Sequence, residues 1–395
     1  MTRNKQQLGI VILNVFAGFP HGGGASARLF AYAKTFNRIG AKCEVWCLKT
    51  SNRDIPATGE FEGVRYRYTT GTARIANNSI EKIIFELRSI INLFFLLLKK
   101  GRSKEINAVL YYSPEHLQFV IPAWLAAKLA GVKFIGERTE YPFTGDAPFR
   151  KKNLKNSFRE SFVYRLFDGF IVISKYLEDY VRPRLRKSVW LLKVPIIVDV
   201  PRFANAADSV EPENIIAYCG LDAAEQERTC EIFSKISEIN PSWKLMIVGA
   251  VRQNLKDMLF EKTSVVKKEQ IIFFGNVNRE DLPMTLARAK ILVLPRSSGM
   301  FSTAGFPTKL GEYLATGKPV IVTDTGDISE YLTNNQNSYL VPADNNAIFA
   351  ETLQNAISNY SEAKQIGLNG REIALSCFDA KLWCEKILNA LSMDK

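Results

Sequence analysis

Short apolar runs alternate with helical stretches along the whole chain, and this alternation limits the fold more than any other feature. Runs rich in β-branched and aromatic residues predict strands, and the stretches between them are long enough for helices. The first half predicts strands at residues 8–15, 43–48, 108–112, 133–137, 169–173 and 189–194. The second half predicts strands at residues 215–219, 244–248, 271–274, 291–294, 319–323 and 338–341. This order is typical of the α/β class, in which helices cover doubly wound, parallel sheets.

The length of 395 residues indicates two domains, because one hydrophobic core stops growing at about 250 to 300 residues. A polar stretch at residues 201–214 separates the two series of strands and is predicted to be an irregular linker. We therefore expect Rossmann-like domains at residues 1–205 and 206–375, with ligands beyond the carboxyl ends of their strands.

A C-terminal segment, residues 376–395, follows the second domain. Within it, residues 378–393 predict an amphipathic helix with one apolar side, formed by Leu382, Ile387, Leu388 and Leu391. The helix either packs locally or crosses back onto the first domain, and the sequence does not choose between them.

The net charge of +12 is concentrated in the first half of the chain. Residues 1–205 hold 33 Lys and Arg against 16 Asp and Glu, a net charge of +17. Residues 206–395 hold 19 against 24, a net charge of −5. One domain is therefore expected to face an anionic partner. Nucleic acid is disfavoured, because the basic residues lack the interleaved aromatic side chains of a stacking platform.

Cysteine and histidine usage indicates a reducing compartment. The six scattered cysteines do not resemble a disulfide framework, and two histidines do not form a zinc site of the usual spacing. We expect no structural metal and no cofactor.

The first seven residues are polar and lead directly into a predicted strand, without the apolar region of a signal peptide. A cytoplasmic protein is therefore expected.

Residues 80–104 combine an apolar run with a basic end. Charged residues such as Glu86 and Arg88 interrupt the run, so it lacks the roughly 20 uninterrupted apolar residues of a membrane-spanning helix. The pattern favours an interfacial helix on an anionic membrane, and thus a peripheral protein on its inner face. Basic residues at 150–152, 155 and 182–187 add to the same charge. The alternative is a buried crossover helix with ordinary flanking lysines.

Residues 294–323 carry the most informative motif. A loop of small residues leads into a predicted helix whose first turn holds Pro307, a favoured early position. The free N–H groups and positive dipole end of such a helix suit a diphosphate, and Lys309 adds a full charge to the same anion. Glu312, about one turn further on, has two oxygens that are able to accept hydrogen bonds from the two hydroxyls of a ribose.

This motif resembles the signature of family 4 of the retaining GT-B glycosyltransferases, in which one Glu precedes a second by eight positions. Glu312 matches the second Glu, and the resemblance implies that it binds the donor ribose. Ala304 stands at the first Glu position, so the usual contact to a donor sugar hydroxyl is missing. The sequence of residues 306–320 resembles that of a bacterial branch of the family that assembles surface polysaccharides.

A second departure from the family concerns the donor diphosphate. Family members usually carry Arg and Lys just after the first strand of the second domain, where this chain has Leu221 and Gln226. Arg228, Arg252 or Lys309 is expected to substitute, although a helix-surface arginine is the ordinary interpretation of Arg228. The predicted donor-binding residues are Gly275, Val277, Gly305, Phe306, Thr308, Lys309, Glu312 and Arg228.

The glycine-rich loop after the first strand resembles the family's acceptor or phosphate loop. It predicts acceptor contacts by Gly22, Gly23 and Gly24. The loop lacks the Gly-x-Gly-x-x-Gly spacing, which disfavours a dinucleotide site.

The first domain also offers titratable side chains. The family tends to place a His after the strand at residues 133–137, where this chain has Glu137 and Glu140. We expect Glu140 to bind an acceptor hydroxyl and Glu137 to act as a base, unless both pair with Arg138 and nearby lysines. His116 is the other candidate, or else a capping residue. The predicted catalytic residues are Lys309, Glu137 and His116.

These patterns predict a glycosyltransferase of the EC 2.4 class that moves a sugar from a nucleotide-diphosphate donor to a glycan or lipid-linked acceptor. The resemblance implies retention of the anomeric configuration. The sequence has no Asp-x-Asp motif, so we expect backbone N–H groups and cations to stabilise the leaving diphosphate in place of a metal. Two alternatives stay open: a nucleotide-sugar epimerase, and a non-catalytic homologue that binds nucleotide or glycan within an assembly complex.

Overall fold

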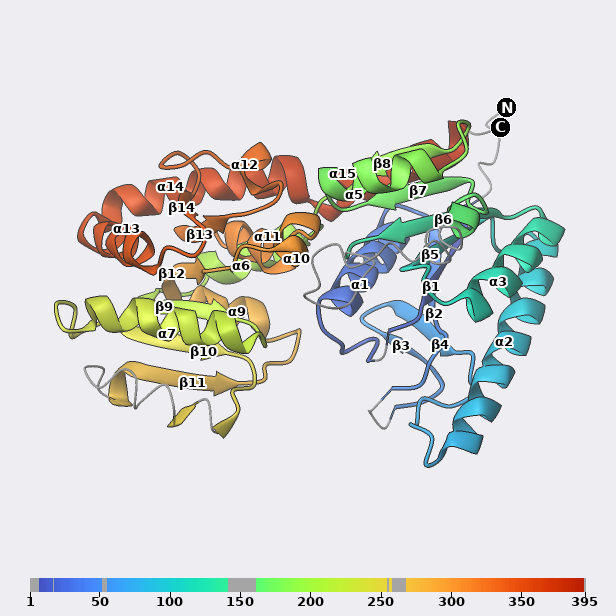
Figure 1. Ribbon diagram of the computed structural model, residues 1–395, viewed down its shortest axis with the longest axis horizontal. Coiled ribbons are helices and arrows are strands. Elements are labelled where there is room, and N and C mark those ends of the chain that lie inside the picture. Colours follow the sequence, from blue (N-terminus) through green and yellow to red (C-terminus); the bar gives the residue numbers. More distant parts are fainter. Residues whose placement is uncertain are drawn as a thin grey trace. The chain divides into compact units, whose positions relative to one another are not determined.

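Each of two units is built on its own sheet (Figure 1). The computed structural model describes residues 7–16, 18–51, 55–140, 161–253, 256–257 and 268–393. The first unit comprises Met1–Pro195 and Ala380–Lys395, and the second comprises Ile196–Asp379. All the predicted strands are present, so the α/β class with two doubly wound sheets is confirmed. The basic residues at 150–152 and 155 lie outside the described residues.

The sheet of the first unit has the order β3-β4-β2-β1-β5-β6-β7-β8. Its strands are β1 (Gly9–Asn14), β2 (Lys42–Cys47), β3 (Thr58–Phe61), β4 (Val64–Tyr68), β5 (Ala108–Tyr112), β6 (Lys133–Arg138), β7 (Gly169–Val172) and β8 (Trp190–Lys193). All neighbours pair in parallel except β3 and β4. The central strands β1 and β5 are buried along their whole length, as expected when helices cover both faces.

The antiparallel hairpin of β3 and β4 is an element that the sequence analysis did not predict. Glu62 and Gly63 form its two-residue turn, with positive φ angles of 43° and 79°. Such a left-handed turn matches the twist of the strands that it joins. β4 alternates buried with more exposed residues, which is the pattern of a strand with one face toward solvent.

Helices cover both faces of this sheet (Figure 1). They are α1 (Gly24–Arg38), α2 (Ser79–Arg102), α3 (Leu117–Ala130), α5 (Lys175–Val181) and α15 (Ala380–Met393). α1 and α15 pack together on one face, and α2 and α3 pack together on the other. α15 thus belongs to the first unit although it follows the second in sequence. Its residues Ile387 and Leu391 line an apolar pocket with Ile10 and Phe36.

Local sequence explains the ends of α2. Asn78 caps the helix, and its side chain accepts a hydrogen bond of 2.9 Å from the backbone N–H of Glu81. Lys99, Lys100 and Arg102 lie in the last turn, where positive charge complements the helix dipole. The basic end of the predicted segment is therefore the C-terminal end of this helix.

α2 buries only a narrow stripe of its surface, which includes Leu93 and Leu97. Six of its large apolar side chains are between 54% and 72% exposed, and they are Ile80, Ile83, Ile84, Leu87, Ile91 and Phe95. The neighbouring α3 adds three exposed residues, Ile121, Leu125 and Leu129. The alternative of a buried crossover helix is therefore wrong for most of α2. Among the described residues, no helix is both long and apolar enough to cross a membrane.

The sheet of the second unit has the order β11-β10-β9-β12-β13-β14 and is parallel throughout. Its strands are β9 (Glu213–Cys219), β10 (Lys244–Val248), β11 (Ile271–Gly275), β12 (Ala289–Leu294), β13 (Val320–Asp324) and β14 (Tyr339–Pro342). Its main helices are α6 (Val200–Asp208), α7 (Ala223–Ser237), α9 (Leu282–Ala287), α10 (Met300–Ala304), α11 (Thr308–Ala315), α12 (Ile328–Tyr331), α13 (Asn346–Ser358) and α14 (Tyr360–Ile373). α7 packs with α13, whereas α11 packs with α6 and α14.

The prediction of an irregular linker at residues 201–214 is wrong. α6 occupies most of that stretch, and its residues Val200, Phe203, Ala206 and Ala207 are buried. Arg371 of α14 anchors the end of this helix with two hydrogen bonds to Asp208, of 2.9 and 3.0 Å. The polar residues that suggested a linker are the solvent side of an amphipathic helix. The boundary expected at residues 205/206 lies inside α6, whereas the units meet at Pro195 and Ile196.

Candidate functional site

The carboxyl ends of β9 and β10 lie side by side in the second unit, where Cys219 pairs with Val248. Each strand is followed by a glycine, Gly220 or Gly249. Gly249 has a φ of +130°, and a Cβ atom there would collide with the carbonyl oxygen of Gly220. These close approaches require glycine and leave the backbone accessible beyond the strand ends.

α11 begins beside these strand ends. Pro307 is its N-cap residue rather than part of its first turn, and Thr308 and Lys309 open the helix. The first N–H groups of a helix have no partner within it, so they are available to an anion. Lys309 and Glu312 are three residues apart and therefore lie on one face of α11.

Glu312 is a partly buried carboxylate on α11. Burial raises its pKa above the ordinary value, and the nearby Arg279, Lys309 and Arg202 offset part of that rise. Within the described part of the chain, no hydrogen bond is made by its side chain. Both of its oxygens are therefore available to a ligand with paired hydroxyl groups.

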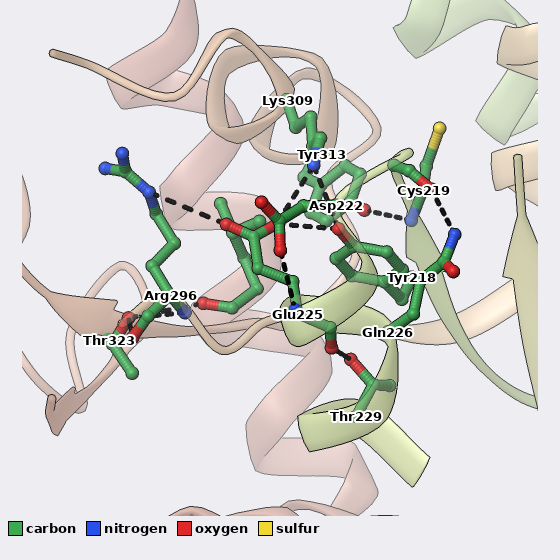
Figure 2. Close-up of polar contacts among 12 residues, drawn as sticks. Tyr218, Cys219, Asp222, Glu225, Gln226, Thr229, Arg296, Lys309, Tyr313 and Thr323 are labelled. Carbon is green, nitrogen blue, oxygen red and sulfur yellow. Dashed lines mark hydrogen bonds and ion pairs between the residues drawn. The ribbon is translucent and has the colours of Figure 1, made fainter. Parts of the chain in front are cut away.

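Lys309 does not stand alone, because it belongs to a cluster that joins α7, α11 and the loop after β12 (Figure 2). Its Nζ lies 3.1 Å from Oε2 of Glu225 and 3.1 Å from the hydroxyl of Tyr218. Tyr218 itself donates a 2.6 Å hydrogen bond to Glu225. Nε of Arg296 lies 4.0 Å from Oε1 of the same carboxylate. A Cβ atom on Gly220 would collide with the Lys309 ammonium group, so this glycine makes room for it.

The sequence analysis did not single out Glu225, Tyr218 or Arg296 as site residues. Arg296 adds a positive charge to this cluster, whereas Leu221 and Gln226 stand where the resembled family has Arg and Lys. Burial lowers the pKa of Arg296, and Glu225 offsets part of that effect. The position of Arg296 just after β12 was the signal that could have identified it. This buried strand is parallel to β9 and ends at the same edge of the sheet.

Gln226 and Leu221 have roles unlike those of the family's cations. Gln226 is buried, and its amide donates hydrogen bonds to the carbonyl oxygens of Gly220 and Ala250. It thereby joins the loops after β9 and β10. Leu221 is 67% exposed. Neither side chain carries charge to a diphosphate.

Two predicted donor residues have other partners. Arg228 binds Asp344 at 2.8 Å and Ser297 at 3.2 Å, so its guanidinium group is already neutralised by a carboxylate. Phe306 is 6% exposed, and its ring packs on Tyr331 and Phe378 with centroid distances of 5.5 and 5.7 Å. The structure therefore contradicts a donor contact by the Phe306 side chain, whereas the phosphate contact by Arg228 stays a prediction.

The remaining predicted donor residues lie on loops and at a helix start of the second unit. Gly275 ends β11 with a φ of +77°, and a Cβ atom there would meet no neighbour among the described residues. Val277 follows it in a partly exposed loop. Gly305 lies between α10 and α11, and Thr308 is the first residue of α11. Ala304, at the first Glu position of the family, is fully buried.

In the first unit, the glycine-rich loop follows β1 and opens α1, as predicted. Gly23 is the N-cap residue, and a Cβ atom there would meet no neighbour among the described residues. Gly24 is the first helical residue. Gly22 is more constrained, since a Cβ atom would collide with the side chain of Ser26.

Glu137 is fully buried and paired with Arg28 of α1. Its Oε1 accepts hydrogen bonds from Arg28 at 2.8 Å and from the Tyr32 hydroxyl at 2.9 Å. A carboxylate without solvent contact that is held by an arginine is a structural ion pair, so the structure contradicts its role as a catalytic base. The expected alternative of pairing was right in kind, but the partner is Arg28 rather than Arg138.

His116 and Glu140 lie near the carboxyl ends of β5 and β6. Nε2 of His116 is 2.9 Å from Nζ of Lys49, and its side chain makes no capping hydrogen bond to α3. Burial raises the pKa of Glu140, as does Glu115, whereas Arg138 lowers it. Both predicted residues thus belong to a polar cluster at one edge of the sheet. Within the described residues, no group of three or more His, Cys, Asp or Glu side chains is placed to hold a metal ion.

Sequence comparisons relate parts of the chain to known proteins. Residues 202–373 match the model of the family described as glycosyl transferases group 1. The uncharacterized glycosyltransferase MJ1178 of Methanocaldococcus jannaschii is 21% identical over 229 residues, which cover 58% of this chain and 61% of that protein. TuaH of Bacillus subtilis, a glycosyltransferase assigned to teichuronic acid biosynthesis, is 29% identical over 90 residues, or 23% of this chain and 22% of TuaH. The chain thus spans less than two thirds of either relative.

Structural comparison bears on the whole chain. The crystal structure of HepE from Anabaena, in complex with UDP and glucose, superposes with a TM-score of 0.69 at 14% sequence identity. The match covers 98% of this chain and 100% of HepE, and it shows a common fold. The chain therefore has the GT-B fold, and residues 202–373, which lie in its second unit, match the model of the glycosyl transferases group 1 family.

Proposed function

We propose that this protein transfers a sugar from a nucleoside-diphosphate sugar to a glycan or lipid-linked acceptor during the synthesis of a surface polysaccharide. The observation that carries this proposal is the pair formed by Glu312 and Lys309 on α11. The Glu312 carboxylate, which makes no side-chain hydrogen bond to any described residue, lies one helical turn from an ammonium group and the helix start. Together they match the ribose and the diphosphate of one ligand.

The donor occupies the carboxyl edge of the second sheet in this proposal. Glu312 accepts hydrogen bonds from the ribose hydroxyls, and the nucleobase lies near Gly275 and Val277. The diphosphate lies at the start of α11, with Lys309 and Arg296 as its cations. UDP is the first nucleotide to test, because it is the nucleotide in the HepE complex.

The transfer step breaks the bond between the anomeric carbon and the diphosphate oxygen. The acceptor hydroxyl forms the new bond on the face that the diphosphate leaves, which retains the configuration, and its proton passes to an oxygen of the departing diphosphate. The diphosphate gains negative charge as the bond breaks. Preorganised N–H groups and cations stabilise that charge without the reorganisation that water would need.

The first unit is proposed to bring the acceptor, and it does so at an anionic membrane surface on the cytoplasmic side. Six exposed apolar side chains on α2 form one face, and Lys99, Lys100 and Arg102 lie at the end of the same helix. Such a helix lies in the interfacial plane, where apolar burial and attraction to anionic lipids act together. A lipid-linked acceptor would be reached at that surface.

A non-catalytic role is the second candidate function. The observation that favours it is the placement of Gln226, which is buried and bound to backbone carbonyls where the family carries a phosphate-binding cation. A protein of this kind would bind a nucleotide within an assembly complex without turning over a donor.

Turnover separates the two candidates. Purified protein is incubated with radiolabelled UDP-sugars and a lipid extract, and UDP release and labelled product are measured. The proposal expects product with a retained anomeric configuration by NMR, and its loss in Glu312→Ala. Glu351→Ala, the same change on the exposed surface of α13, should leave turnover unchanged. UDP binding without turnover of any donor would favour the non-catalytic role.

A further inference from the structure

The carboxylate of Glu225 occupies the cations of the proposed diphosphate site (Figure 2). Its Oε2 accepts hydrogen bonds from Lys309 and Tyr218, and its Oε1 faces Arg296 at 4.0 Å. All three ionic side chains are at most 26% exposed. A carboxylate and a phosphate accept hydrogen bonds from the same donors, so the two groups are chemically interchangeable at this position.

Helix capping alone does not account for this arrangement. Asp222 is the N-cap residue of α7 and accepts a hydrogen bond of 2.9 Å from the N–H of Glu225. The Asp-x-x-Glu spacing is that of a capping box, in which the Glu side chain reaches back to the N–H of the N-cap residue. Here the Glu225 oxygens point to Tyr218, Lys309 and Arg296 instead. The capping box thus gives Glu225 a second place to bind.

We propose that Glu225 and the donor diphosphate compete for Lys309 and Arg296. This inference rests on the proposed function and adds to it an internal anion that the bound donor displaces. Displacement costs little, because the freed carboxylate takes the capping-box position at the start of α7, where a negative charge is favourable. The two cations then pair with the diphosphate.

Charge balance makes the competition necessary. Lys309, Arg296 and Glu225 together carry a net charge of +1, and a diphosphate that enters while Glu225 stays in place meets a like charge a few ångströms away. Coulomb repulsion at that distance is strong where water is largely excluded. The same balance explains how two cations without a bound phosphate are held together, since Glu225 neutralises one of them.

The competition also explains how the site works without the family's usual Arg and Lys. Those positions are Leu221 and Gln226, and their charge is supplied from β12 and α11 by Arg296 and Lys309. Cations held by an internal carboxylate bind the donor less tightly than free ones. They also regain Glu225 as UDP departs, which favours product release.

Calorimetry with UDP and with uridine tests this inference, because only UDP carries the diphosphate. Glu225→Gln keeps the size and shape of the side chain and removes its charge. We expect it to bind UDP about tenfold more tightly than the wild type, with uridine binding unchanged. Lys309→Met and Arg296→Met should weaken UDP binding by a similar factor and leave uridine binding unchanged.

Two further variants make the result interpretable. Glu213→Gln removes an equal charge at the opposite end of β9, where Glu213 pairs with Arg288 at 2.9 Å, and should not change UDP binding. Glu225→Ala gives the same expectation as Glu225→Gln and suits a helical position, should the glutamine variant fail to fold.

The outcomes separate the inference from the proposed function. Tighter UDP binding by the Glu225 variants alone supports the competition. Unchanged or weaker UDP binding by both of them, in a wild type that binds UDP through Glu312, overturns the competition and leaves the proposed function intact. If neither the wild type nor any variant binds a nucleotide, both are overturned.

Discussion

Nε of Arg28 donates a hydrogen bond of 2.8 Å to Oε1 of Glu137, and both side chains are buried. The same guanidinium group donates to the carbonyl oxygens of Val194 and Pro195 at 3.0 and 2.6 Å. One arginine of α1 thus joins β6 to the segment that ends the first series of strands. Arg28 therefore ties α1, β6 and the segment after β8 together within the first unit.

Removing one partner of this pair should destabilise the first unit strongly. Arg28→Met leaves the Glu137 carboxylate buried without its cation, and we expect a loss of about 3 to 5 kcal/mol in the free energy of unfolding. Urea denaturation measures it. Lys34→Met is the matched control, because its pair with Glu62 is exposed and worth at most about 1 kcal/mol. A loss below about 1 kcal/mol for Arg28→Met would contradict a structural role.

Glu312→Gln should stabilise the protein while it impairs donor binding. Burial raises the pKa of Glu312 in the fold, so the ionised carboxylate destabilises the folded state at neutral pH. We expect a gain of about 0.5 to 2 kcal/mol over the wild type at pH 7. Because the Glu312 pKa is raised in the fold, the free energy of unfolding of the wild type falls as the pH rises through that pKa. The advantage of the variant should therefore shrink as the pH is lowered toward the ordinary pKa of a glutamate. Thermal unfolding at several pH values checks both expectations, and a variant less stable than the wild type at pH 7 would contradict them.

The apolar face of α2 should carry membrane binding. Ile83 and Leu87 are 58% and 55% exposed and lie one turn apart. We expect the double variant Ile83→Glu, Leu87→Glu to lose co-sedimentation with vesicles that contain phosphatidylglycerol. The reason is that two charges replace apolar side chains that the membrane would bury. Ile239→Glu, at a residue of the second unit that is 66% exposed, should sediment like the wild type. Equal vesicle binding by both variants would contradict membrane binding through α2.

Restoring the family's cations should succeed at one position and fail at the other. Leu221→Arg places a charge on an exposed residue beside Gly249, so we expect a change in stability within about 0.5 kcal/mol and tighter binding of UDP. Gln226→Lys breaks two buried hydrogen bonds to backbone carbonyls and should cost about 1 to 3 kcal/mol. Thermal unfolding and calorimetry measure the two effects. A stable Gln226→Lys variant with improved binding would show that Gln226 has no structural role.

The fold could be predicted largely from the sequence, because each buried parallel strand is a short apolar run. The hairpin of β3 and β4 was missed although β4 alternates polar and apolar residues, because its turn, Glu62 and Gly63, is not one of the commonest pairs. Residues 201–214 include two prolines and seven polar or charged residues, and this composition favoured a linker over the helix α6. Its buried side became evident only from its packing with α9 and α11.

The site could be predicted only where one motif contains it. Glu312 and Lys309 share α11, so helical spacing alone brings them together. Tyr218 and Glu225 precede Lys309 by 91 and 84 residues, and only the tertiary fold brings them to Lys309 and Arg296. The burial of Glu137 and Phe306 could not be predicted either. The sequence alone does not show whether a carboxylate or an aromatic ring faces a ligand or the core.

The central claim is that the second unit binds a nucleoside diphosphate through Glu312. Isothermal titration calorimetry of the wild type and Glu312→Ala with UDP, and with GDP for comparison, tests it most directly. The account predicts that the wild type binds one of the two nucleotides and that Glu312→Ala loses at least about 1.4 kcal/mol of binding free energy, a factor of ten. Equal binding by the wild type and Glu312→Ala, or no binding of either nucleotide by well-folded protein, would contradict it.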